Sequence, residues 1–419
     1  MRIQAKSPAT KTFLLISAFL LCFLFISFAS CQYLASVLAE RNDQVNLQRA
    51  VRLQPFNAEY RDRLGIYFSL LNPNAAAQSF RAAVSLNPYR ADYWLALARA
   101  YNSLGDVQAQ GPALRNALKM APTDPTILWE TANVYFSGGN TEETLHLCRR
   151  LLNDPGPDFG QALPFCWRVK PDVALFISKL MPLRTDAYES FLNLLISKQE
   201  TVAATRAWGQ LVSLHNPVLR PRVFEYVNYL LTKKQPDAAM KVWQQAGPLA
   251  DISNYQPSRE NLVVNGNFSL PILKAGFDWI YQKNRNVSLA LDPAQHQSGT
   301  RSLSISFEDA QIEDAGIGQL VFVHPNRTYN FSANFKAQQI EGAGGIRFAL
   351  DDAYTHAPIL ATDNLTDTSN WKQVNGTFTV GPETSLLMLR LQRLPAGDVI
   401  KGKLWIDGVR LTEQLQQQP

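Results

Sequence analysis

The residues that could carry out acid–base or nucleophilic chemistry are few and scattered along this chain of 419 residues. The five histidines are widely separated, and no nucleophile-elbow, metalloprotease or phosphate-loop motif occurs. Adjacent carboxylates occur at 308–309, 313–314 and 351–352. A glycosidase needs two carboxylates at a fixed separation across a cleft, whereas adjacent pairs in turn-rich segments usually belong to solvated loops. The sequence therefore favours a binding protein over an enzyme.

The four cysteines fall into two pairs. Cys22 and Cys31 belong to an apolar N-terminal segment. Cys148 and Cys166 lie further along and could form a disulfide outside the cytoplasm. They could equally be two small buried side chains. Zinc is not expected, because the chain has neither a CxxC motif nor paired histidines.

One set of residue types recurs every 34 positions between Asn57 and Gly156. Its members combine aromatic or large apolar residues with small ones, and a proline closes each of the first two units. The three passes are Tyr60, Leu64, Tyr67, Ala76, Phe80, Ala83, Pro88; then Trp94, Ala98, Tyr101, Gln110, Leu114, Ala117, Pro122; then Leu128, Ala132, Tyr135, Thr144, Cys148, Leu151. A period of this length indicates stacked helix pairs, which usually bind partners.

These positions resemble the tetratricopeptide repeat, closely over 57–90 and 91–124 and fairly over 125–156. A turn cluster at 153–158 interrupts the pattern, which returns in units that begin near 185 and 220. The resemblance implies an α-helical solenoid over residues 43–250. It also implies a protein partner on the concave face of that solenoid.

Residues 12–39 carry no charge and are dominated by Phe, Leu, Ile and Ala. Roughly 20 apolar residues cross a bilayer as a helix. Arg2, Lys6 and Lys11 precede the segment, so the positive-inside rule keeps residues 1–11 in the cytoplasm. We expect an uncleaved, single-pass anchor in the cytoplasmic membrane, with the bulk of the chain outside the cytoplasm.

Two other fates of this segment stay open. Signal cleavage could follow Ala39, although the apolar run is longer than the roughly 7–15 residues of a signal core. Lipidation could occur at Cys31, where Phe28-Ala29-Ser30-Cys31 has Phe in place of the usual Leu of a lipobox. Just beyond the segment, Leu47, Ala50 and Pro55 fit the second helix of a repeat whose first helix is missing. The chain there is still leaving the membrane.

After a polar linker at 251–260, the apolar periodicity changes from that of a helix to that of a strand. Strict alternation at 302–307, 329–336 and 389–392, between turn residues, indicates an antiparallel sandwich. A polar tail, 413–419, ends the chain. The expected fold is therefore a multidomain α + β chain: a transmembrane helix, a helical solenoid and a C-terminal antiparallel β-sandwich.

Three framework segments, 261–268, 276–279 and 404–411, resemble the jelly-roll carbohydrate-binding modules of the galactose-binding-like superfamily. The resemblance covers 261–412 and implies a polysaccharide ligand, held by aromatic faces and by polar side chains. The candidate ligand-binding residues are Trp279, Tyr281, Arg347, Trp371 and Arg390. The tryptophans could equally be core residues and the arginines simply solvated.

Modules of this family often hold a structural calcium between their first strands and a carboxylate near the C-terminus. Asp407 matches that carboxylate, but Ser269 stands where the opening motif commonly has Glu. Loss of a carboxylate weakens a site for a hard cation. No other cofactor is expected, and a calcium ion at Asp407 stays an open alternative.

Together these patterns favour a membrane-anchored, extracytoplasmic scaffold in envelope or exopolysaccharide assembly. The solenoid would hold a protein and the sandwich a glycan. In the alternative, the sandwich docks a protein without binding sugar; a third candidate is an envelope polysaccharide hydrolase. A net charge of +5 without clustered Lys or Arg argues against a nucleic-acid partner.

Overall fold

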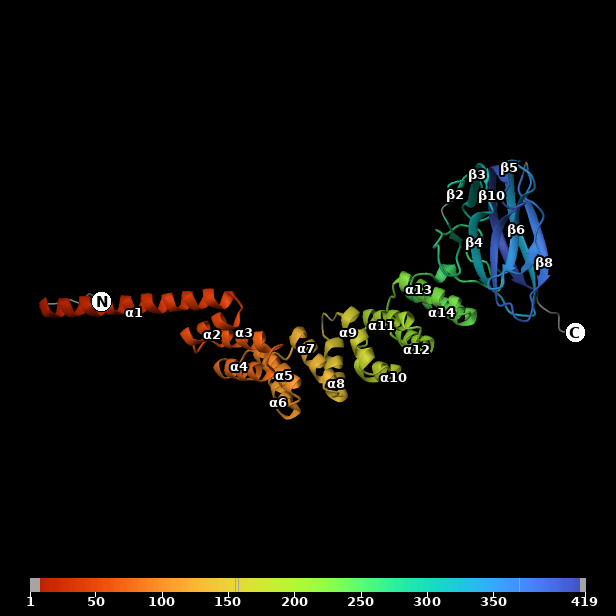
Figure 1. Ribbon diagram of the computed structural model, residues 1–419. Coiled ribbons are helices and arrows are strands. Elements are labelled where there is room, and N and C mark those ends of the chain that lie inside the picture. Colours follow the sequence, from red (N-terminus) through yellow and green to blue (C-terminus); the bar gives the residue numbers. More distant parts are fainter. Residues whose placement is uncertain (1–7, 155, 157, 283, 369, 415–419) are drawn as a thin grey trace. The chain divides into compact units, whose positions relative to one another are not determined.

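The computed structural model describes residues 8–154, 156, 158–282, 284–368 and 370–414. Along the chain, helices come first and strands follow (Figure 1). The helices are α1 (Pro8–Glu40), α2 (Gln44–Leu53), α3 (Ala58–Phe68), α4 (Pro73–Leu86), α5 (Ala91–Leu104), α6 (Val107–Met120), α7 (Pro125–Ser137), α8 (Thr141–Leu152), α9 (Phe159–Val169), α10 (Val173–Leu175), α11 (Thr185–Ser197), α12 (Thr201–Ser213), α13 (Arg220–Thr232) and α14 (Pro236–Leu249). A π-helical turn, Phe176–Leu180, follows α10, and a 3-10 turn, Ser253–Tyr255, follows α14.

Local chemistry sets where several of these helices begin. Asn57, Asn72 and Asp124 precede α3, α4 and α7, and each side chain accepts a backbone N–H of the first turn. The residues at the repeat positions are then buried: Ala76, Phe80 and Ala83 in one unit and their counterparts in the next two. Helices α11 and α13 begin at Thr185 and Arg220, where the sequence placed the later units. The helical-repeat fold is confirmed.

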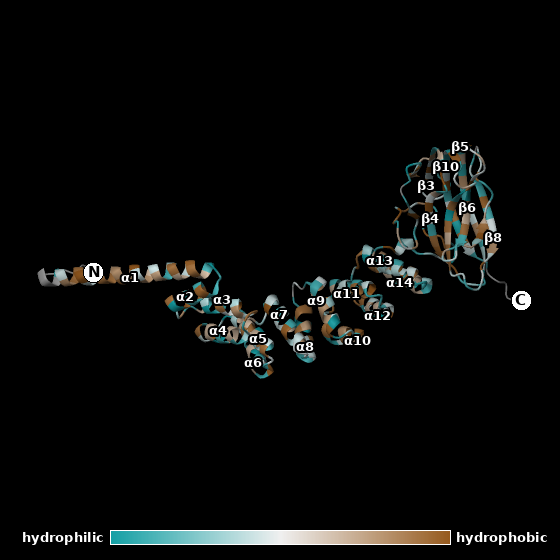
Figure 2. Cartoon of the chain, in the orientation of Figure 1, coloured by the Kyte–Doolittle hydropathy of each residue, from teal (hydrophilic) through white to brown (hydrophobic). Residues whose placement is uncertain are grey.

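Among the described residues, one helix is long and apolar enough to cross a membrane, and it is residues 11–40 of α1. Figure 2 shows the apolar residues that dominate this helix. Only its last turns are buried: Ala35 and Ala39 pack against Leu47, Ala50 and Val51, the core face of α2. The C-terminal end of α1 therefore serves as the first helix that the initial repeat lacked in the sequence.

The chain divides into two compact units, residues 1–182 and 183–419. The second unit contains α11–α14 together with the strands. The last two helix pairs therefore belong to the same compact unit as the strands. The segment 251–260, expected as a polar linker, buries Ile252 and Tyr255.

Trp243 of α14 joins the last helices to the sandwich. Its indole is fully buried, meets Phe277 edge to face with ring centroids 5.9 Å apart, and donates from Nε1 to the Tyr255 carbonyl at 2.7 Å. Gly276 lies against the indole: a Cβ atom there would come within 2.2 Å of Trp243 Cζ3, and its φ of +61° also favours glycine. Helix α14 and the sandwich thus share one packed core.

The sandwich consists of two five-stranded antiparallel sheets, which confirms the predicted fold class. Its strands are β1 (Ile280–Tyr281), β2 (Val287–Asp292), β3 (Ser302–Gln311), β4 (Asp314–Phe322), β5 (Thr328–Glu341), β6 (Gly345–Asp352), β7 (Pro358–Ala361), β8 (Lys372–Thr379), β9 (Leu386–Leu394) and β10 (Val399–Glu413). Sheet A has the order β1-β4-β9-β6-β7, and sheet B the order β2-β3-β10-β5-β8. Alternate residues of each long strand enter the core between the sheets.

Candidate functional site

The outer face of sheet A carries a groove of about 450 Å³, here called the outer groove. Side chains from β1, β4, β6 and β9, from the residue after β1 and from the loop after β6 line it. They are Ile280, Gln282, Asp314, Leu320, Asp351, His356, Met388 and Arg390. Gly316 and Gly318 occupy outward positions on β4 within this groove and present no side chains there. The groove is therefore an open, mostly polar surface with three apolar side chains, Ile280, Leu320 and Met388.

An ion pair between Arg390 and Asp351 is the fixed polar element of the outer groove. Arg390 donates from Nε at 2.9 Å and from Nη2 at 2.7 Å, both to Asp351 Oδ2. The Asp351 side chain is only 8% exposed, whereas that of Arg390 is 36% exposed. One carboxylate oxygen takes both donors, so the guanidinium is held in place with part of its surface facing the groove.

Arg347 extends the polar surface along the same face. It stands opposite Gln392 in the β6–β9 register and donates from Nη2 to Gln392 Oε1 at 3.4 Å. Its buried Nε has no partner in the structure. The structure therefore places Arg347 and Arg390, both expected from the sequence, on one face of one sheet.

The three expected aromatic residues lie elsewhere. Trp279 is 2% exposed, stacks on Phe268 at 5.0 Å and donates to the Asn265 carbonyl at 3.2 Å, so no face of its indole is open to a sugar ring. Tyr281 packs against the core, and the Lys274 ammonium lies 4.1 Å from its ring centroid. Trp371 is half-buried, immediately before β8 of sheet B.

The outer groove therefore differs from the aromatic platform that the sequence led us to expect. Within the part of the chain that the structure describes, its lining contains no Phe, Tyr or Trp. Met388 and Leu320 supply apolar surface instead. The residues that sequence reasoning missed are Gln282, His356 and Met388; the alternation of β9, which puts Met388 two residues before Arg390, could have identified the last.

The carboxylates 351–352 are not a solvated loop pair. Both are buried at the end of β6, and successive residues of a strand point to opposite faces. Asp352 accepts backbone N–H groups of Tyr354 and Thr355 and the Thr384 hydroxyl. Burial raises the pKa of Asp352, but these hydrogen bonds outweigh it and hold the pKa below its ordinary value. Asp352 therefore fixes the turn after β6, while Asp351 pairs with Arg390 on the outer face, and the two carboxylates do not converge.

The residues around Asp407 do not fit a calcium site. Asp407 is fully buried, and its Oδ2 accepts the backbone N–H groups of Gln297 and Ser298, both at 2.6 Å. Its Oδ1 accepts the Ser298 hydroxyl at 2.6 Å. Calcium requires oxygen ligands, whereas hydrogen-bond donors surround this carboxylate. Among the described residues, no three His, Cys, Asp or Glu side chains gather into a metal-binding group.

The guanidinium of Arg301 lies against the loop at 268–269, where the family's opening motif would supply a calcium ligand. Arg301 donates from Nε to the Phe268 carbonyl at 2.9 Å and from Nη2 to the Ser269 carbonyl at 3.0 Å. Ser269 is the residue that replaces the Glu of the opening motif. A fixed cation of the chain itself therefore binds the carbonyls of this loop.

Asp278 is the one ionisable residue of the sandwich with a strongly raised pKa in the described part of the chain. It is fully buried, its Oδ2 accepts the Leu273 N–H at 2.6 Å, and its Oδ1 has no partner. Burial raises the pKa of Asp278 to about 6, against the hydrogen bond from the backbone of Leu273, which lowers it. It lies beside Trp279 in the core and takes no part in the outer groove.

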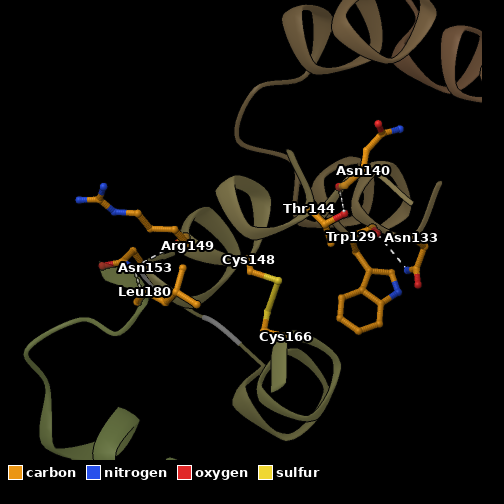
Figure 3. Close-up of a disulfide and its surroundings, with 9 residues drawn as sticks. All are labelled: Trp129, Asn133, Asn140, Thr144, Cys148, Arg149, Asn153, Cys166 and Leu180. Atoms are coloured by element: carbon orange, nitrogen blue, oxygen red, sulfur yellow. Dashed lines mark hydrogen bonds between the residues drawn. A yellow bond between two sulfur atoms is a disulfide. The ribbon is translucent and has the colours of Figure 1, made fainter. Parts of the chain in front are cut away.

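In the helical repeats, Cys148 of α8 and Cys166 of α9 are joined as a disulfide with a Cα–Cα distance of 5.7 Å (Figure 3). The bridge links a regular repeat to the irregular one that follows. Nearby, Asn153 donates to the carbonyls of Arg149 and Leu180, and so ties the end of α8 to the turn after α10 (Figure 3). These bonds stabilise the stack where its periodicity fails.

Comparison with known proteins agrees with this architecture. Residues 260–396 match the family model of a carbohydrate binding domain, and residues 91–124 match that of a tetratricopeptide repeat. Both are non-catalytic binding modules: the repeats imply a protein partner, and the sandwich implies a carbohydrate ligand. No curated protein matches the chain.

Parts of the chain are also similar to several solved structures. A structure described as "CBM4 structure and function" is 15% identical, with 36% of this chain and 99% of that chain covered and a TM-score of 0.29. The CBM22-1 xylan-binding domain from Paenibacillus barcinonensis Xyn10C is 16% identical (35% and 91% covered, TM-score 0.25). The MamA protein is 16% identical (52% and 90% covered, TM-score 0.26).

Proposed function

We propose that this chain is a membrane-anchored, extracytoplasmic scaffold whose helical repeats hold a protein partner and whose sandwich binds a polysaccharide in the outer groove. The observation that carries the glycan role is the convergence of Gln282, His356 and the Arg390–Asp351 pair on one open sheet face. Such groups donate to and accept from sugar hydroxyls. The match of residues 260–396 to a carbohydrate binding domain supports the same role. A place in envelope or exopolysaccharide assembly follows from combining an anchor, a protein-binding stack and a glycan-binding module.

The contacts of α1 bear on the fate of the N-terminal segment. Cleavage after Ala39 would remove Ala35 and Ala39 and leave the apolar face of α2 uncovered. Lipidation at Cys31 would keep both alanines with the mature chain. The use of its last turns as core therefore argues against cleavage after Ala39. Of the two fates that keep both alanines, we infer the retained membrane anchor, because the apolar run is longer than a signal core and Phe28 stands where a lipobox usually has Leu.

The glycan role is tested on a polysaccharide array with the full-length protein in detergent. The double variant Gln282→Ala/His356→Ala alters two exposed groove residues and leaves the Arg390–Asp351 ion pair intact. The matched control is Gln373→Ala/Asn375→Ala, which removes two exposed polar side chains from β8 of sheet B. We expect the groove variant to lose at least about tenfold in affinity, which is about 1.4 kcal/mol, and the control to bind normally.

Three other results of this experiment would change the proposed ligand site or the proposed function. Loss of binding in the control alone would move the ligand site to sheet B. If the unsubstituted protein bound no glycan, the protein-docking alternative would replace the glycan role. Release of reducing sugar ends from any polysaccharide on the panel would instead revive the hydrolase alternative.

A further inference from the structure

The helices at the start of the repeats alternate in direction, and this places particular loops next to the anchor. Helix α2 runs back along the last turns of α1, because Ala35 and Ala39 pack against its core face after the short turn at 41–43. Helices α3 and α4 continue the alternation. The α2–α3 and α4–α5 loops therefore lie on the edge of the stack that faces the N-terminal direction of α1.

The length of α1 shows how deep the edge with the α2–α3 and α4–α5 loops lies relative to the membrane. Counting from Lys11, roughly 20 helical residues at 1.5 Å each span a hydrocarbon core of about 30 Å. The helix therefore leaves the hydrocarbon near Cys31. A cavity of about 760 Å³ is lined by Phe28, Cys31 and Gln32 of α1 and, from the repeats, by Phe56 and Arg90. The inter-repeat loops thus lie at the depth where α1 emerges from the outer leaflet.

Each of these two loops carries an exposed aromatic side chain at the same repeat position. Phe56 follows Pro55 and is 86% exposed, and Tyr89 follows Pro88 and is 81% exposed. Neither contributes to the core of the stack. Tyr is enriched at membrane–water interfaces, where its ring can be covered by lipid while its hydroxyl stays wet. Phe is among the apolar side chains that interfacial segments bury at the boundary between headgroups and acyl chains.

We propose that Phe56 and Tyr89 lie in the headgroup region of the outer leaflet, so that the edge of the first two repeats rests on the membrane that α1 crosses. This inference rests on the retained anchor of the proposed function. The aromatic pair and the anchor helix then contact the bilayer at three separate points. Three contacts fix how the first repeats are oriented relative to the membrane plane, which a single helix cannot do.

The test places spin labels on the full-length protein in vesicles of phosphatidylcholine and phosphatidylglycerol. In a background where Cys22 and Cys31 are replaced by Ala, labels are attached at Phe56→Cys or Tyr89→Cys. The matched control is Leu70→Cys, because Leu70 is 96% exposed but lies in the α3–α4 turn, on the opposite edge. Power saturation compares collisions with oxygen, which concentrates in lipid, and with a water-soluble nickel chelate.

We expect the labels at positions 56 and 89 to collide more with oxygen and less with the chelate than the label at 70. Equal accessibility at all three positions would overturn the inference. Shielding from both reagents would also overturn it, since a protein surface, such as a second copy of the chain, would then cover the aromatic pair. Flotation of the vesicles separates this failure from failure of the anchor: protein that does not float with the lipid lacks the retained anchor.

Discussion

Replacement of the buried carboxylate Asp278 by its amide should stabilise the sandwich at neutral pH. The folded protein raises the pKa of Asp278 from 3.8 to about 6 because burial disfavours the charged form. At about 1.36 kcal/mol per pKa unit, ionising this group in the folded state costs about 3 kcal/mol. The cost is fully present above pH 6, declines as the pH falls from 6 towards 4, and disappears where folded and unfolded states are both protonated.

The amide recovers only part of this cost. In Asp278→Asn, the side-chain oxygen can still accept the Leu273 N–H, while the amide nitrogen takes the place of Oδ1, which has no partner. An unpaired buried donor costs about 1 kcal/mol or more. The expected net gain is therefore about 1–2 kcal/mol at pH 8, and it should shrink to zero or change sign near pH 4.

The assay is urea denaturation of the compact unit, residues 183–419, between pH 4 and pH 8. Asp363→Asn, at an exposed position of the same unit, is the control and should change stability little at either pH. An Asp278→Asn variant that is destabilised equally at pH 4 and pH 8 would refute the reasoning. The carboxylate would then be a structural acceptor whose ionisation carries no penalty.

Three further outcomes follow from the structure. Replacing Cys148 and Cys166 by Ala removes a disulfide between cysteines that are 18 positions apart. This should lower the unfolding free energy of residues 1–182 by about 3 kcal/mol. Denaturation that neither the double substitution nor a reducing agent affects would contradict this. Trp279→Ala should cost about 3–5 kcal/mol in urea denaturation of the sandwich, and an unchanged midpoint would mean that the indole is not in the core. Asp407→Ala should lower the unfolding free energy by about 3 kcal/mol, because three donors lose their acceptor. Dialysis of the unsubstituted protein against a chelator should leave its melting temperature unchanged. A melting temperature that falls with chelator and recovers with calcium would show that a cation binds there.

The helical half was predictable because its signal is repeated. Small residues such as Ala98 and Ala132 recur at one position of a fixed period, and each copy reinforces the others, so both the helix pairs and their buried faces follow. The end of α1 was not predictable in this way. Ala35 and Ala39 belong to an apolar run in which every residue suits a membrane, so periodicity cannot show which two residues enter a protein core.

In the sandwich, the length of a strand decided for which site residues the sequence could predict whether the side chain faces the core or the solvent. The alternation around Arg390 in β9 is long enough to show that its side chain points away from the core. Trp279 directly precedes β1, which has only two residues, so no alternation distinguishes a core indole from a sugar platform. The Arg390–Asp351 pair depends on the β6–β9 register, which a single sequence does not reveal. Tyr255 was hidden because one aromatic residue among polar neighbours resembles a linker.

The position of Trp243 between α14 and the sandwich has a consequence for cooperative unfolding. An indole shared by two cores cannot leave one without opening the other, so α14 should not fray independently of the strands. In native-state hydrogen exchange, amides of α13 and α14 should then open with the same free energy as those of the central strands. A fragment that began at residue 257 would lack both Trp243 and Tyr255 and would leave Phe277 uncovered. The sandwich and the last helices therefore form one unit of stability, although the sequence assigns them to different architectures.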